Sequence, residues 1–539
     1  MIRALAITEI LRLILLNFAP LVLETGFDFE NDDRSCMWPG ELGKKTGGNK
    51  FYFAPSDRAA LVNAARCNKS FSSVALDILW SVQWSIIPLL RTLPSFIWQN
   101  SADRYTLNRM IRIPDWKRFQ LYRNRIRHLY MQIDDKIDDL ALLQIAQLLK
   151  DRPLMPLLHT LSYSLSNIIF LFLSPHLRHL EIVGTTHGRI SPLFLQTLSK
   201  KVPALVTFSC QEAGLVSRAA WAYLAKFRRL RSIHIANADN LEARELKTIL
   251  DIKDKSNLSL LIPQGSSLQT SLYATVTVHA YALRTLILSA EPALIADVLS
   301  CLVETPIISL RLLYADAYDG HISYENEWRI RLSTISHWSK TLYHLELQDL
   351  CREVQLDAEF SENTSILDPF LKMGKLKSLL FRPNVTFSLT DDHLQKYASA
   401  WPDLEELSLD FWGRDEEPLA TIATLDAFAE LCPNLRSLFI RLHMIESTLP
   451  GIPRVRTHRL QNLYVDYPAH GHNLATVARY LDALFPLLDV VIGRDIDYPG
   501  DEEEDTNHER SFKWGDISAA VKLFQAARAD YRMRGYHSL

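Results

Sequence analysis

The feature that most constrains the fold is a short apolar pattern that recurs along most of the chain. Each copy has an apolar residue, two variable residues, a second apolar residue, one variable residue and a third apolar residue. Eleven clear copies occur: Leu177/Leu180/Ile182, Leu205/Phe208/Cys210, Leu230/Ile233/Ile235, Leu283/Leu286/Leu288, Ile307/Leu310/Leu312, Leu342/Leu345/Leu347, Leu376/Leu379/Phe381, Leu404/Leu407/Leu409, Leu435/Leu438/Ile440, Leu460/Leu463/Val465 and Leu487/Val490/Ile492. Weaker candidates begin at Ile126, Leu158 and Leu258, and successive copies begin 19 to 35 residues apart.

The spacing within a copy predicts a short strand. The last two apolar positions are two residues apart, so they share one face of a strand. Proline stands two residues before five of the copies, where it ends a preceding helix and favours extended backbone. The segments between copies have helical patterns, most clearly at 191–200, 215–227, 391–400 and 425–431.

One strand, one turn and one helix per period is the leucine-rich-repeat unit. A single unit cannot bury its apolar face, but stacked units share a continuous core. The sequence therefore predicts an α/β fold, an irregular leucine-rich-repeat solenoid over 129–495, with a parallel concave sheet and convex helices. The varying repeat lengths and the lack of a regular asparagine or cysteine ladder predict a distorted array.

Length and composition agree with a large repeat protein. The chain has 539 residues, more than a single compact core accommodates, and 48% of them are hydrophobic. The net charge of −3 provides no global field for nucleic acid or an anionic membrane, so we expect neither as a partner. The six cysteines are scattered and form no C-x-x-C pair, which favours a reducing compartment, the cytoplasm or the nucleus.

The residues before the repeats predict helices interrupted by a loop. Residues 4–23 form an amphipathic pattern that Glu9, Arg12 and Asn17 interrupt, whereas a secretory signal would need an unbroken apolar core. A membrane-tethered receptor with this segment as its signal is the remote alternative. Five glycines between 24 and 55 predict a flexible insert. Helical patterns follow up to residue 82, and 83–128 reads as a helical linker.

These N-terminal segments resemble a known family. The segment Leu5–Ile14 resembles the opening of an F-box, and Asp57–Phe71 with Ala75–Trp80 resembles its second and third helices. The stretch Asp115–Ile126 resembles the segment that leads into the repeats of fungal F-box proteins with leucine-rich repeats. The chain departs from that pattern at Thr8, where F-boxes usually carry proline, and in the 24–55 insert within the 1–82 helical region.

The resemblance implies a function. F-box helices dock on the Skp adaptor of a cullin-RING ubiquitin ligase, and the repeats hold a protein substrate, so the chain would be a ligase adaptor in the ubiquitin-like conjugation pathway. The implied adaptor-binding positions are Leu5, Ile7, Ile10, Leu11, Ile14, Leu61, Val62, Cys67, Phe71, Leu79 and Trp80. Two alternatives stay open: helices that only cap the solenoid, and a protein-binding scaffold without ligase association.

The substrate surface is expected on the variable positions of the strands. Charged residues with aromatic ones suit a protein ligand, although each could also belong to a solvated sheet face. The candidates are Glu346, Arg382, Glu406, Asp410, Phe439, Arg441, Tyr464 and Asp466.

The sequence contains no motif that predicts catalysis. We find no G-x-S-x-G, H-E-x-x-H or glycine-rich dinucleotide pattern, and we expect a protein that is not an enzyme and has no cofactor. The pair His470 and His472 lacks a third ligand at a telling spacing, so no metal site is predicted. Residues 496–539 are expected to form an acidic loop, which includes Asp501–Asp505, and a C-terminal capping helix.

Overall fold

The computed structural model describes residues 8–19, 55–99, 104–131, 137–163, 167–183, 190–211, 216–236, 243–252, 254–262, 280–314, 324–350, 364–383, 389–409, 420–442, 455–465, 474–493 and 514–533. The chain divides into two compact units, Met1–Ser259 and Leu260–Leu539, which we describe in turn. Leu5, Ile7, Asp410, Asp466, the 24–54 part of the insert, the His470/His472 pair and the acidic run lie outside the described residues.

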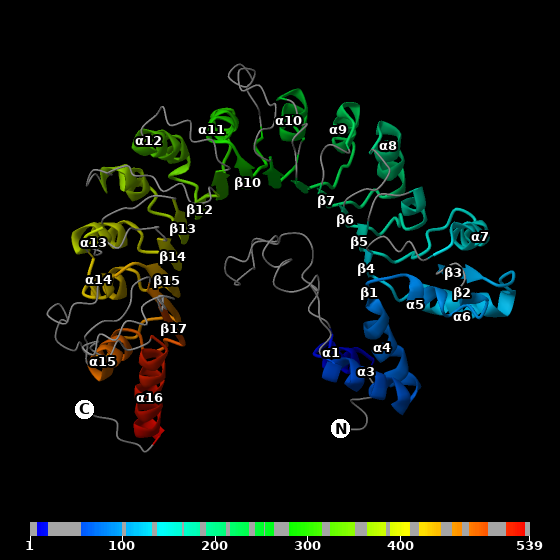
Figure 1. The fold of residues 1–539 in the computed structure, drawn as a ribbon, viewed down its shortest axis with the longest axis horizontal. Coiled ribbons are helices and arrows are strands. Elements are labelled where there is room, and N and C mark those ends of the chain that lie inside the picture. The colour runs from blue at the N-terminus through cyan, green and yellow to red at the C-terminus, as the bar shows by residue number, and fades with distance from the viewer. Residues whose placement is uncertain are drawn as a thin grey trace, which may run out of the picture. The chain divides into compact units, whose positions relative to one another are not determined.

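In each unit, parallel strands follow one another in chain order, and helices connect most neighbours (Figure 1). The sheet of the first unit has the order β1-β4-β5-β6-β7-β8-β9. Its strands are β1 (Val82–Gln83), β4 (His128–Met131), β5 (Thr160–Tyr163), β6 (His179–Ile182), β7 (Thr207–Cys210), β8 (Ser232–Ile235) and β9 (Asn257–Leu261), the last of which reaches the unit boundary. A separate antiparallel pair joins β2 (Phe96–Gln99) to β3 (Arg104–Leu107).

The second unit continues the same alternation in the order β10 to β17. Its strands are β10 (Thr285–Ala290), β11 (Ser309–Tyr314), β12 (His344–Asp349), β13 (Ser378–Arg382), β14 (Glu406–Leu409), β15 (Ser437–Ile440), β16 (Asn462–Val465) and β17 (Val490–Gly493).

The helices between successive strands line one side of each sheet, whereas α1 (Thr8–Leu16), α3 (Pro55–Cys67) and α4 (Lys69–Ser81) lie at the β1 end of the first sheet and α16 (Trp514–Met533) lies at the β17 end of the second (Figure 1). In the first unit the other helices are α5 (Ile87–Leu90), α6 (Ile113–Arg123), α7 (Asp139–Leu149), η3 (Asn167–Leu171), α8 (Pro192–Lys201), α9 (Arg218–Leu224) and α10 (Ala243–Leu250). In the second unit they are α11 (Pro292–Ser300), α12 (Tyr324–Ile335), η6 (Ser336–Trp338), η7 (Thr364–Lys372), α13 (Asp391–Ala400), α14 (Thr424–Leu431) and α15 (Leu474–Leu484), where η marks a 3₁₀-helix.

Local sequence fixes where many of these helices begin. Ser191 caps α8 by accepting a hydrogen bond from the Phe194 amide, with Pro192 in the first turn. Thr390 caps α13 by accepting one from the His393 amide. The helices expected at 191–200, 391–400 and 425–431 are therefore confirmed with little change at their ends.

The core consists of the recurring apolar triplets, and the predicted α/β leucine-rich-repeat fold is confirmed. In the repeat that contains β14, for example, Leu404, Leu407 and Leu409 are all buried, whereas Glu406 is exposed. Register aligns the second apolar residue of each repeat with that of the next, as in the pairing of Leu379 with Leu407. The weaker candidates at Ile126 and Leu158 are confirmed as repeats by β4 and β5.

Two copies have a different register from the predicted one. In β17, Leu488 and Val491 are buried and Val491 pairs with Leu463, whereas the predicted Leu487 and Ile492 are 59% and 50% exposed. Residues 487–492 include apolar side chains at positions that point to either face of the strand. A shift of the strand by one residue therefore exchanges its buried and exposed residues. At β9, Leu258 occupies the second apolar position instead of the first, because Lys255 fills the first.

The segment 83–128 is not the helical linker that the sequence predicted. It contains β1, which joins the main sheet by pairing with His128 and Leu129, and the β2–β3 pair, besides α5 and α6. Aromatic residues favour strands, and Phe96 stacks on Tyr105 across this pair with ring centroids 5.1 Å apart. The repeat architecture therefore begins directly at the end of α4.

The C-terminal helix packs on the last repeat as predicted. Trp514, Ile517 and Val521 of α16 are buried, and the helix contacts both α15 and β17. The Gln525 side chain donates a hydrogen bond to the Leu488 carbonyl at 2.7 Å. Among the described residues, no helix is long and apolar enough to cross a membrane.

Lys255 is an unusual core residue in the first unit. Its side chain stands where other repeats carry leucine or isoleucine, and its ammonium nitrogen donates to the carbonyls of Ile249 and Leu250 at 2.7 and 3.2 Å. These carbonyls belong to the C-terminal end of α10, which favours a cation. Burial nevertheless lowers the pKa of Lys255 to about 7, with Asp251 opposing the shift.

We predict that this lysine makes the first unit more stable at alkaline pH. Above about pH 7 the folded lysine has lost its proton, while the unfolded one keeps it up to its ordinary pKa of 10.5. Unfolding then takes up a proton, so stability rises with pH by up to about 1.4 kcal/mol per pH unit. Chemical denaturation at a series of pH values should show this rise in the native chain and not in Lys255→Met. Parallel pH profiles for the two proteins would contradict the assignment.

Candidate protein-binding surfaces

The N-terminal helices form a small cluster with a core of its own. Leu11 and Leu15 of α1 are buried together with Leu61 of α3 and Val74 and Ile78 of α4. Leu11 and Leu15 are four residues apart and so occupy one side of α1. This core holds the three helices together without using the repeats.

A second apolar side of α1 faces solvent in the described structure. Ile10, Leu13 and Ile14 are 38%, 68% and 43% exposed, and their i, i+3, i+4 spacing places them in one stripe. We call these three residues the α1 stripe. Leu16 of α1 and Val62 of α3 are also exposed. A nine-residue helix with apolar residues on two sides is typical of an element that contacts both its own core and a partner.

The structure sorts the described residues among the implied adaptor-binding positions into three groups. Ile10, Ile14, Val62 and Cys67 are exposed, while Leu11 and Leu61 are buried in the cluster core and hold the helices together. Phe71 and Leu79 pack partly against that core, and Trp80 is half-buried. Sequence reasoning missed Leu13, although its distance of three residues from Ile10 was a usable signal.

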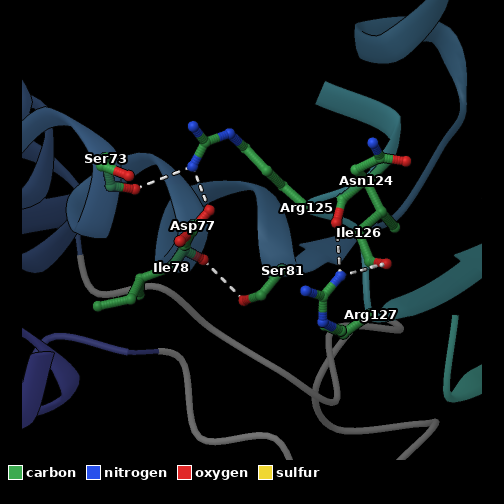
Figure 2. A network of polar contacts seen from close by, with 8 residues as sticks. All are labelled: Ser73, Asp77, Ile78, Ser81, Asn124, Arg125, Ile126 and Arg127. Carbon is green, nitrogen blue, oxygen red and sulfur yellow. Dashed lines mark hydrogen bonds and ion pairs between the residues drawn. The ribbon is translucent and has the colours of Figure 1, made fainter. Parts of the chain in front are cut away.

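The cluster is joined to the first strand without a linker. Ser81 ends α4 and Val82 begins β1, and the Arg127 amide donates to the Ser81 carbonyl at 2.9 Å. The guanidinium of Arg125 donates to the Ser73 carbonyl at 2.9 Å and also pairs with Asp77 (Figure 2). Helix α4 is thus tied to the backbone that enters β4.

Aromatic contacts support the same junction. Trp80 of α4 lies against Tyr122 of α6, with ring centroids 4.4 Å apart. Trp84, just after β1, stacks on Tyr130 of β4 at 5.0 Å, and Tyr130 is buried with Val82. The orientation of the helices relative to the first repeats of this unit is therefore fixed by packing as well as by polar contacts.

The predicted substrate residues that the structure describes lie in the second unit, on the sheet face opposite the helices. We call this the open face. Strand register places Glu346, Leu380, Ser408, Phe439 and Tyr464 in one row across β12 to β16. Phe439 stacks on Tyr464 with ring centroids 6.1 Å apart. Glu406 lies in the adjoining row, where it accepts a hydrogen bond from Ser378 at 3.1 Å.

The charged members of this face are held by partners. Arg311 of β11 forms an ion pair with Glu346, and both are half-buried. Burial raises the pKa of Glu346 above its ordinary value, and Arg311 opposes the shift. Sequence reasoning missed Arg311, although it stands between Leu310 and Leu312 as Glu346 does between Leu345 and Leu347. Arg382 and Arg441 are half-buried on β13 and just after β15.

The open face of the first unit has a different chemistry. His128, Thr160, His179 and Thr207 follow one another across β4 to β7. The Nδ1 atoms of His128 and His179 lie 3.0 and 3.1 Å from the hydroxyls of Thr160 and Thr207. Burial is the main cause that lowers the pKa of His128 to about 4, so its ring is neutral near pH 7. Polar side chains that hydrogen-bond to one another therefore line this row.

Metal ligation receives no support from the described residues. They contain no group of three or more histidine, cysteine, aspartate or glutamate side chains placed to hold a metal ion.

Comparisons with known proteins give structural likeness only. No protein-family model matches the chain, and no curated protein matches its sequence. A chain of the yeast Rad7–Elc1 complex is 16% identical, with a TM-score of 0.35 over 63% of this chain and 76% of that one. The leucine-rich-repeat-containing protein LegL7 of Legionella pneumophila is 15% identical, with a TM-score of 0.27 over 68% and 91%. The fold assignment here rests on the strand order and burial described above.

We predict that Arg125 fixes the helical cluster to the first repeat. Arg125→Ala removes both the bond to the Ser73 carbonyl and the pair with Asp77, whereas Asp77→Ala removes only the pair, which is half exposed and worth less. Hydrogen exchange of the amides at 78–83 should become roughly tenfold faster in Arg125→Ala and change less in Asp77→Ala. Arg118→Ala, an exposed change on α6, serves as the control. Unchanged exchange in Arg125→Ala would show that the aromatic contacts suffice.

Proposed function

We propose that the chain is a substrate-recognition adaptor of an SCF-type cullin-RING ubiquitin ligase. Helices α1, α3 and α4 dock on the Skp adaptor, and the repeats hold a protein substrate. The chain performs no chemistry itself and needs no cofactor, because its contribution is to bring a substrate close to a recruited enzyme. The observation that carries this proposal is the α1 stripe on a helical cluster with a separate core.

The exposure of the stripe supports docking over a purely internal role. A helix that served only to cap the repeats would direct its apolar side chains onto them. In the described structure, Leu11 and Leu15 already supply the internal contacts of α1, while Leu13 is 68% exposed. Clustered exposed aliphatic side chains are typical of interaction sites.

The junction supports a proximity mechanism. An adaptor works only if the docked end and the substrate-holding end keep a defined geometry. The direct passage from α4 into β1, with the Arg125 and Trp80 contacts, transmits the position of the helices to the first repeats of the same unit. A loose tether would not do this.

The second unit offers the substrate surface in this proposal. Phe439 and Tyr464 form an aromatic pair on its open face, between polar and charged neighbours. Aromatic and arginine side chains carry much of the binding energy in protein interfaces. The thiols of Cys67 and Cys432, which form no disulfide in the described structure, agree with a place in the cytoplasm or nucleus.

The second candidate is a protein-binding repeat scaffold without ligase association. It is favoured by the position of the helices at β1, the edge strand of the first unit's sheet, because solenoids require a cap there. Under this alternative the α1 stripe would have no adaptor partner.

Co-purification with the Skp adaptor tests the proposal. The native chain should retain the adaptor, and the triple variant Ile10→Glu, Leu13→Glu, Ile14→Glu should lose it, because three carboxylates would have to be desolvated in the interface. These residues are exposed, so thermal stability should change little.

The matched control is the triple variant Leu140→Glu, Leu143→Glu, Leu148→Glu on α7, whose side chains are also exposed. It adds the same charge and should still bind. Failure of the folded native chain to bind the adaptor would reject the ligase role and leave the scaffold. Equal retention by the α1 variant would move docking to another surface.

A further inference from the structure

One edge of the first unit's sheet is strongly basic. The basic part of this edge consists of four turns that lead from the helix of one repeat into the strand of the next, at 150–158, 174–178, 200–206 and 225–231, and it ends before the α10–β9 turn, which carries Asp251 and Asp254. We call the exposed cations of these turns the basic edge: Lys150, Arg152, Arg178, Lys200, Lys201, Lys226, Arg228, Arg229 and Arg231. The only carboxylate in the same turns is Asp151, whereas the whole chain has a net charge of −3.

Arginines within the basic edge and beside it have a regular spacing. Arg127, Arg178 and Arg231 stand immediately before β4, β6 and β8. Backbone hydrogen bonds of 2.7–2.8 Å run from Arg178 to His159, from His159 to Arg127, from Val206 to Arg178 and from Arg231 to Val206. These arginines are therefore two strands apart, or about 10 Å at the usual strand separation. A peptide in the extended polyproline II conformation has three residues per turn, so it presents residues i and i+3 on the same side about 9 Å apart.

The positive charge of this edge is poorly compensated. Within the described residues, Arg178, Arg229 and Arg231 take part in no ion pair. The pKa of nearby His159 is lowered, first by burial and then by Arg127 and Arg178. Arg127 is half-buried and donates to the carbonyls of Asn124 and Ile126, so it contributes charge from just beneath the surface.

The repeat architecture does not itself require such an edge. In the second unit the corresponding turns mix both signs, and their charges are partly paired. Lys377 forms an ion pair with Glu405 at 2.9 Å, and Arg456 lies 3.5 Å from Asp426. The turns there also carry Asp403 and Asp489. The basic edge of the first unit is thus a specific feature of those repeats.

We propose that the basic edge binds an acidic segment of a partner protein in the extended polyproline II conformation. The segment carries carboxylate or phosphate groups at about every third residue, and each group is held by an arginine of the edge. Arginine suits this role because its guanidinium forms paired hydrogen bonds with either group. Complementary charge also accelerates the encounter between the partners.

A protein segment fits this edge better than nucleic acid or a membrane does. The described residues of these turns include no exposed phenylalanine, tyrosine or tryptophan on which bases could stack, since Tyr223 is half-buried just before them and lies beneath Lys226. They also lack exposed leucine, isoleucine or phenylalanine for insertion into lipid. The proposal does not rest on adaptor docking, because a scaffold would bind the segment equally well.

The test uses the purified full chain and labelled peptides with glutamate, phosphoserine or glutamine at every third residue. The glutamate or phosphoserine peptide should bind, with affinity falling as salt rises, and the glutamine peptide should not. The variant Arg178→Gln, Arg229→Gln, Arg231→Gln should weaken binding by roughly tenfold or more. Comparing the two acidic peptides tells carboxylate from phosphate recognition.

The matched control is Lys375→Gln, Arg436→Gln, Arg459→Gln, which removes three exposed charges at corresponding positions before β13, β15 and β16. It should bind like the native chain. Equal binding by the two variants, no binding of either acidic peptide, or binding only of a DNA duplex or of phosphatidylserine vesicles would overturn the proposal. Adaptor co-purification by the basic-edge variant separates this result from the ligase role, since the edge residues lie outside the α1 stripe.

Discussion

The structure depends on apolar side chains that can be buried only between neighbouring repeats. One strand contributes two core residues, which is too little apolar surface to fold alone. In the second unit, Leu310, Leu345, Leu379 and Leu407 align through strand register, so each repeat covers the next. This series of aligned leucines sets the strand order and directs the intervening residues to the open face.

The same series of aligned leucines is compatible with irregular repeats, because bulky or polar side chains fill the variable space between the helices and the sheet. Trp338 and Trp401 are buried, and their indole nitrogens donate to the carbonyls of Thr305 and Phe370 at 2.7 and 3.0 Å. Such bonds satisfy backbone groups of the preceding repeat. Buried Arg331 pairs with Asp349 at 3.2 Å and covers the ring of Tyr314. Variation in repeat length is therefore compatible with a continuous core.

The first unit combines a helical cluster, a basic edge and a polar open face, while the second unit carries an aromatic pair among charged residues. Each of these surfaces consists of residues that do not belong to the buried series of aligned leucines. That separation explains how a repeat protein can hold several protein contacts at once without loss of stability. Under the proposed function, the helical cluster serves the ligase and the other surfaces serve substrates.

The sequence by itself determined the repeat and most strand positions, because alternation within Leu404/Leu407/Leu409 and its counterparts is a local property. It also determined helix starts such as Ser191, whose cap depends on nearby residues alone. Only the tertiary structure decided the register at 487–492, where both faces are apolar, and which of Ile10 and Leu11 is buried, because both choices suit a helix. Only the stacking of the repeats brings the basic edge together. Its arginines come from different repeats, and they lie along one edge because parallel strands begin at the same edge of a sheet.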